Sequence, residues 1–131
     1  MSTDYDHSIV VDSLSHFYGD FQALDDVSFT VDKGEILGFL GPNGAGKTTV
    51  MKILTCYMGA TRGDAKVAGF DVYEDFDEVR KRVGYLPENV PLYDDMLVYD
   101  YLTFVSQVRN VPPEQIDSRI RRVSSRVGLD N

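Results

Sequence analysis

The chain has 131 residues, of which 43% are hydrophobic, and its formal net charge is −8 at pH 7. This length suggests one domain with a globular core. No apolar run approaches the roughly 20 residues that span a bilayer, and the acidic, polar start does not resemble a secretory signal. The acidic balance argues against broad nucleic-acid binding. The single cysteine, Cys56, excludes an internal disulfide and suits a reducing compartment.

Three strands are predicted before a glycine-rich loop. Residues 8–14 predict the first strand, and residues 27–31 alternate apolar and polar side chains as a half-buried second strand does. Lys33-Gly34 indicates a turn. Residues 36–40 are a nearly continuous apolar run, which is typical of a parallel strand buried on both faces.

The segment after the loop predicts a helix, a strand, a second helix and a strand, in that order. Residues 65–69 indicate the first of these strands and residues 83–87 the second. Residues 75–82 predict a short helix whose acidic residues come first and basic residues last, as the helix dipole favours. The first helix, directly after the loop, is predicted by the helical spacing of Val50, Ile53, Leu54 and Tyr57.

Two amphipathic helices are predicted in the last third of the chain. The first begins near Val98, which cannot cap it, so Asp94 or Asp95 is the expected cap. The second begins near Pro113 and ends before Gly128. Its arginines are interpreted as a solvated face rather than a nucleic-acid patch: Arg119, Arg121, Arg122 and Arg126.

Residues 41–48 match the pattern G-x-x-x-x-G-K-[ST], which binds the phosphates of nucleoside triphosphates. The glycines let backbone N–H groups turn toward an anion, and the lysine brings a positive charge to the β- and γ-phosphates. The threonine hydroxyl reaches Mg²⁺. A buried strand before the loop and a helix after it fit this chemistry, because the helix N-terminus adds free N–H groups and a partial positive charge.

The flanking residues distinguish among classes of phosphate-loop protein. The Asp-x-x-Gly and Asn-Lys-x-Asp strings of GTPases do not occur. Small-molecule kinases usually begin with the phosphate-loop strand, whereas here two predicted strands come before it. Residues 16–19 (His-Phe-Tyr-Gly) and 23–29 (Ala-Leu-Asp-Asp-Val-Ser-Phe) resemble the opening of the ATP-binding domains of ABC transporters. In that family an aromatic residue at the position of Tyr18 stacks on adenine, a contact that suits any base because each has a π-face.

The resemblance continues after the loop. Residues 83–88 (Val-Gly-Tyr-Leu-Pro-Glu) are similar to the start of the family's Q-loop, with Glu88 in place of the usual glutamine. A carboxylate is a suitable Mg²⁺ ligand, but it cannot donate a hydrogen bond unless protonated, which leaves a water-positioning role open. Residues 85–94 most resemble the ABC-2 export subgroup and its gliding-motility-like relatives.

By matched position the resemblance implies ATP and Mg²⁺ as ligands. Lys47 would stabilise the phosphates, Thr48 and Glu88 would approach the metal, and no general base is expected among these residues. The full nucleotide-binding set implied is Tyr18, Gly41, Pro42, Asn43, Gly44, Ala45, Gly46, Lys47, Thr48 and Thr49.

The resemblance covers the first part of the family's domain. The signature Leu-Ser-Gly-Gly-Gln, the apolar run ending in Asp-Glu and the switch histidine are absent. We therefore interpret residues 1–131 as an N-terminal fragment of one ABC ATP-binding domain, truncated before the signature. The implied fold class is α/β, a phosphate-loop NTPase core with an N-terminal antiparallel β subdomain. Residues 8–70 would hold that subdomain with the loop strand and helix, 71–88 the helix and strand to the Q-loop, and 89–131 the start of the helical subdomain.

The function implied is that of the ATP-binding subunit of an ABC transporter, an ATPase coupled to export. The expected partners are a transmembrane permease subunit and a second ATP-binding domain paired head to tail, with no nucleic acid. The expected location is cytoplasmic, peripheral on the inner face of the cell membrane. The fragment itself is expected to bind nucleotide weakly, to hydrolyse it little, and to self-associate or exchange strands through the open edge at residues 36–40. A soluble ABC-type ATPase acting on the ribosome or DNA, and a non-catalytic nucleotide-binding module, remain alternatives.

Overall fold

A computed structural model describes residues 7–129, so the acidic start lies outside the described residues. The chain divides into two compact units, one up to Tyr85 and one from Leu86 onward. The division falls within residues 71–88. The first unit carries the sheet and the glycine loop, and the second carries two helices.

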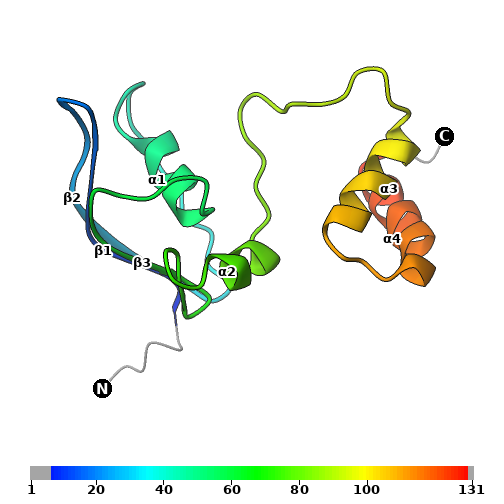
Figure 1. The fold of residues 1–131 in the computed structure, drawn as a ribbon, viewed down its shortest axis with the longest axis horizontal. Helices are drawn as coiled ribbons and strands as arrows, with labels where there is room; N and C mark the ends of the chain where they lie inside the picture. Colours follow the sequence, from blue (N-terminus) through cyan, green and yellow to red (C-terminus); the bar gives the residue numbers. More distant parts are fainter. Residues whose placement is uncertain (1–6, 130–131) are drawn as a thin grey trace. The chain divides into compact units, whose positions relative to one another are not determined.

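The first unit is built on an antiparallel sheet whose strand order is β2-β1-β3-β4 (Figure 1). Each strand pairs antiparallel with its neighbour, as expected for the N-terminal β subdomain. The long hairpin of β1 and β2 turns at Gly19, whose φ of 58° lies in the left-handed region that glycine adopts readily. The strands are β1 (His7–Tyr18), β2 (Phe21–Asp32), β3 (Arg62–Val67) and β4 (Phe70–Asp71).

The core of this unit lies between the sheet and two helices. Helix α1 (Lys47–Leu54) buries Ile53 completely, and α2 (Phe76–Arg82) buries Val79 completely. The helical spacing after the loop correctly indicated Val50, Ile53 and Leu54 on the buried face of α1. The fourth residue of that pattern, Tyr57, lies beyond the end of α1 and is exposed, because the helix stops at Leu54. The strands contribute the remaining apolar side chains of the core, among them Val11, Leu14, Leu24, Ala65 and Val67.

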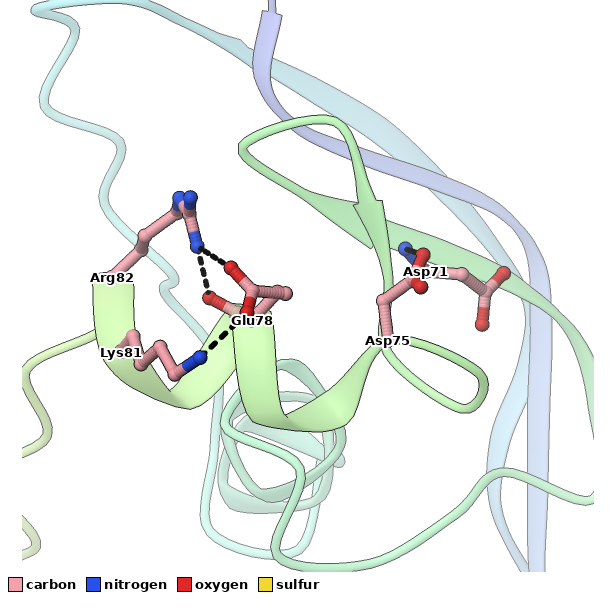
Figure 2. A network of polar contacts seen from close by, with 5 residues as sticks. All are labelled: Asp71, Asp75, Glu78, Lys81 and Arg82. Atoms are coloured by element: carbon pink, nitrogen blue, oxygen red, sulfur yellow. Dashed lines mark hydrogen bonds and ion pairs between the residues drawn. The ribbon is translucent and has the colours of Figure 1, made fainter.

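Helix α2 follows an acidic turn, and ion pairs between its own side chains link its first and last turns (Figure 2). Asp75 accepts the backbone N–H of Asp71 at 3.2 Å, which holds the turn before the helix. Glu78 accepts hydrogen bonds from Lys81 at 2.6 Å and from Arg82 at 2.7 Å. These bonds, that of Lys81 first, hold the pKa of the Glu78 carboxyl below its usual value. The predicted helix at 75–82 and its charge order are confirmed.

Two predicted strands are not formed. Residues 36–40, expected as the strand that leads into the loop, and residues 83–87, expected as the strand leading to the Q-loop, are irregular. Ile36 is 98% exposed and Leu40 is 96% exposed, whereas Phe39 packs edge-on against Phe29 with ring centroids 4.9 Å apart. A strand requires a neighbour to complete its hydrogen bonds. In residues 7–129 neither segment pairs with another, so an apolar run alone does not produce a strand.

A third predicted strand is displaced along the chain. Residues 65–69 were expected to form it, but β3 ends at Val67, and Ala68 and Gly69 form a tight turn into β4. Both turn residues have positive φ, 52° and 81° respectively. The turn allows Phe70 to pair with Val67, which adds a short fourth strand to the sheet.

The exposed apolar segment leads to a prediction about association. We expect the 131-residue chain to self-associate, and Leu40→Lys to weaken that association at least about tenfold, because a leucine side chain gains about 1.5–3 kcal/mol on burial. Sedimentation velocity over a range of concentrations measures this. Thr30→Lys, which adds the same charge at an exposed polar position of β2, is the matched control. A stable monomer of the unsubstituted chain would contradict the prediction.

The second unit is a pair of helices, α3 (Val98–Val108) and α4 (Pro113–Arg126), as predicted. Pro113 occupies the first turn of α4, and Gly128 follows its end with a φ of 74°. The capping prediction is wrong. The N-cap residue of α3 is Leu97, and within the described residues neither Asp94 nor Asp95 makes a capping hydrogen bond. The arginines of α4 are exposed, in agreement with a solvated face.

Candidate nucleotide-binding site

The glycine loop leads directly into α1, whose first residue is Lys47. Gly44 and Gly46 have φ values of 85° and 91°, which glycine adopts without the strain of a side chain. The helix begins with a 3.0 Å hydrogen bond from the Val50 N–H to the Gly46 carbonyl. The N–H groups of the first turn therefore have no partner within the helix and are available to an anion.

Gly46 lies tightly against β2. A Cβ atom at this position would be 2.5 Å from the Ala23 carbonyl oxygen and 2.6 Å from Leu24 Cδ2. By contrast, a Cβ atom at Gly44 would meet nothing within 4 Å. Gly46 is thus required both by its backbone conformation and by the close approach of the hairpin, and it fixes the start of α1 against the sheet.

Lys47 folds back over the loop. Its Nζ donates to the carbonyl oxygens of Gly41 and Pro42, each at 2.6 Å. An ammonium group has three donors, so one remains for an anionic oxygen at the mouth of the loop. The same contacts offset the negative ends of two carbonyl dipoles that would otherwise repel a phosphate.

The two threonines after Lys47 differ in their surroundings. Thr48 is exposed, so its hydroxyl is accessible to a ligand, whereas Thr49 is only 7% exposed. Thr49 Oγ1 lies 3.4 Å from the hydroxyl oxygen of Tyr18, at the end of β1. The fold therefore brings Tyr18, which is 31 residues earlier in the sequence, to the first turn of α1.

Glu88 is an exposed residue of the second unit, whereas the loop belongs to the first. Its role near a metal remains a prediction. Within residues 7–129 no three His, Cys, Asp or Glu side chains are grouped as a metal site. That is compatible with Mg²⁺, which proteins usually hold through one or two ligands together with substrate phosphates and water. The Thr48 hydroxyl is an oxygen ligand of the required kind.

Two neighbours of Tyr18 were not singled out from the sequence as site residues. His16 packs edge-on against the Tyr18 ring with centroids 4.6 Å apart, and Met58 Sδ accepts from the Tyr18 hydroxyl at 3.3 Å. The alternation of β1 could have indicated His16, because residues two apart lie on one face of a strand. No sequence signal indicates Met58, which approaches only after the chain turns at Cys56, with a φ of 57°.

Among residues 7–129, none of the helices has the length and apolar character needed to cross a membrane.

Known proteins resemble this chain over most of its length. The family model described as "ABC transporter" matches residues 24–131. The probable multidrug ABC transporter ATP-binding protein YbhF of Escherichia coli is 39% identical over 116 residues, covering 88% of this chain and 20% of YbhF. The uncharacterized ABC transporter ATP-binding protein MJ1023 of Methanocaldococcus jannaschii is 36% identical, covering 94% of this chain and 42% of MJ1023.

A solved structure of an ATP-binding subunit of an ABC transporter superposes with a TM-score of 0.81 at 27% identity. It covers 93% of this chain, which in turn spans 51% of that subunit. The chain thus spans about half of the solved subunit and less than half of the two sequence relatives. The matched family residues include the whole glycine loop and α1. The chain therefore belongs to the ABC transporter family, as part of an ATP-binding protein.

Proposed function

We propose that this chain is the phosphate-binding part of an ABC exporter ATPase and that it binds Mg²⁺–ATP at the glycine loop. The observation that carries the proposal is the convergence at one loop of the Lys47 ammonium and the unpaired N–H groups of α1's first turn. A positively charged side chain and a helix N-terminus together favour a phosphate.

Each part of the nucleotide has a proposed partner. Residues 43–49 surround the phosphates, and Lys47 neutralises charge on the β- and γ-oxygens. Thr48 supplies a hydroxyl to Mg²⁺, which shields phosphate charge when bound. Tyr18 presents an aromatic face to adenine. Glu88 approaches the metal from the Q-loop position.

Coupling to transport concerns the whole protein. The resemblance of residues 85–94 to the export subgroup supports export. Among relatives, a protein from Rattus norvegicus that is 39% identical over 116 residues, covering 86% of this chain and 7% of its own length, is called phospholipid-transporting ATPase ABCA3. We propose that residues 89–101 face a transmembrane permease subunit and that a second ATP-binding domain pairs head to tail with this one. The complete subunit is proposed to lie in the cytoplasm at the inner face of the membrane, without nucleic acid as a partner.

The test of this proposal is to measure ATP binding and turnover on the same purified 131-residue chain. We expect calorimetry with Mg²⁺ to detect ATP binding, and turnover to be negligible. These residues supply neither a general base nor the partner's signature, so stabilisation of the transferring phosphoryl group is incomplete. A Lys47-dependent rate comparable to that of intact transporters would refute the turnover part. No binding by a chain whose circular dichroism shows it to be folded would refute the whole proposal.

A further inference from the structure

Tyr18 is contacted on several sides by its own protein, although its side chain is the last of β1 and is 45% exposed. His16 lies edge-on to its ring at an interplanar angle of 81°. Its hydroxyl is 3.3 Å from Met58 Sδ and 3.4 Å from Thr49 Oγ1. An exposed tyrosine in a turn would have none of these contacts.

The hydrogen-bond directions at the Tyr18 hydroxyl are determined by chemistry. A thioether sulfur can only accept, so the Tyr18 O–H donates to Met58. A phenol has one proton to donate, so in the 3.4 Å contact the Thr49 hydroxyl is the donor and Tyr18 the acceptor. The result is a chain of contacts that runs from the first turn of α1, through Tyr18, to Met58.

The contact from behind the ring comes from a buried side chain. His16 is only 8% exposed and follows Leu14 on the core-facing side of β1. Its Nδ1 has no hydrogen-bond partner among the described residues, so its contribution to Tyr18 is the edge-to-face contact of the ring. His16 therefore restricts the ring from the core side, and Met58 and Thr49 restrict its hydroxyl end.

We propose that His16, Thr49 and Met58 are positioning residues, which hold the Tyr18 ring ready to stack on a purine base. Through Thr49, they couple base stacking to the phosphate loop. The inference rests on the proposed function, since it presumes ATP in the loop and a base against Tyr18. A ring that is already held in place loses less conformational entropy when the base binds, so the purine contributes more affinity.

The experiment compares ATP with inorganic tripolyphosphate, each with Mg²⁺, by calorimetry on the full chain. The ratio of the two affinities isolates the contribution of the nucleoside. Tyr18→Phe keeps the aromatic face but loses the hydroxyl and its contacts with Met58 and Thr49. We expect the ratio to fall about three- to tenfold, the range for weak hydrogen bonds. Met58→Leu, which removes the acceptor, is expected to lower the ratio in the same direction. Tyr57→Phe removes a hydroxyl from an exposed neighbour and is the matched control.

A double-mutant cycle separates positioning from a general loss of structure. The Tyr18→Phe and Met58→Leu changes combined should lower the ratio no more than Tyr18→Phe alone, because Tyr18→Phe already removes the contact that Met58→Leu removes. Thr49→Ser, which keeps the hydroxyl, should preserve the ratio, whereas Thr49→Val should lower it. Urea midpoints of all variants report any loss of folding.

The possible results separate a failure of the positioning inference from a failure of the proposed function on which it rests. If Tyr18→Ala leaves the ratio unchanged, no base stacks on Tyr18 and that part of the proposed function fails. If Tyr18→Ala lowers the ratio but Tyr18→Phe and Met58→Leu do not, stacking stands and the positioning inference is overturned. Additive effects of Tyr18→Phe and Met58→Leu would also overturn it.

Discussion

Lys47→Met is expected to weaken ATP binding about 10- to 100-fold, the range for losing hydrogen bonds from a charged group. The methionine chain is similar in length but has neither a charge nor a donor, so the β- and γ-phosphates would lose the cation that the loop holds in place. The Gly41 and Pro42 carbonyls would also lose their 2.6 Å partners. Calorimetry with Mg²⁺ present measures the change.

Lys52→Met is the matched control for this substitution. Lys52 belongs to the same helix, α1, and its Nζ lies 5.7 Å from the centroid of the Tyr57 ring rather than in the loop. The control removes the same charge from the same helix, so it reports the effect of net charge alone. Equal losses for both variants would show that affinity depends on overall charge, and unchanged affinity in Lys47→Met would remove the basis of the proposed site.

Gly46→Ala is expected to destabilise the first unit by about 3–5 kcal/mol, in the range that marks a specific steric mechanism. Two costs combine, because alanine at a φ of 91° is strained and its Cβ would meet the Ala23 carbonyl oxygen at 2.5 Å. Relief would require α1 or β2 to shift, which would disturb the phosphate cradle. The urea midpoint at unchanged m measures the loss of stability, and we expect ATP binding to fall with it.

Gly44→Ala separates the two costs. Its φ of 85° is similar, but a Cβ atom there would have open space around it. Only the backbone penalty should remain, about 1–2 kcal/mol for a left-handed residue. If Gly46→Ala were no more destabilising than Gly44→Ala, the close packing of the loop against β2 would not be energetically important.

The parts of the fold that were predicted correctly depend on neighbours close in sequence. The period of apolar residues in α1, α3 and α4 is a local pattern, and so are Pro113 at the start of the last helix and Gly128 beyond its end. The loop's glycines also act locally, since φ values of 85° and 91° need residues without a side chain. The Gly-Lys-Thr motif could therefore be interpreted without knowledge of the rest of the chain.

The contacts of Tyr18 could not be predicted from such local patterns. Its proposed role came from a family resemblance, because nothing in the residues around it predicts contact with Thr49, 31 positions later. The side chains that contact Tyr18, those of His16 and Met58, were not identified as site residues. The contact with His16 depends on the register of β1, and the contact with Met58 depends on the turn after α1.

The sequence by itself determined the phosphate loop, the helix after it and the two helices of the second unit, because these depend on backbone conformation and short-range spacing. Only the tertiary structure decided that the apolar residues 36–40 form no strand, and that Tyr18 reaches the first turn of α1. Both outcomes depend on partners distant in the chain. A strand exists only where another strand completes its hydrogen bonds, and a side chain is held in place only by what the fold brings beside it.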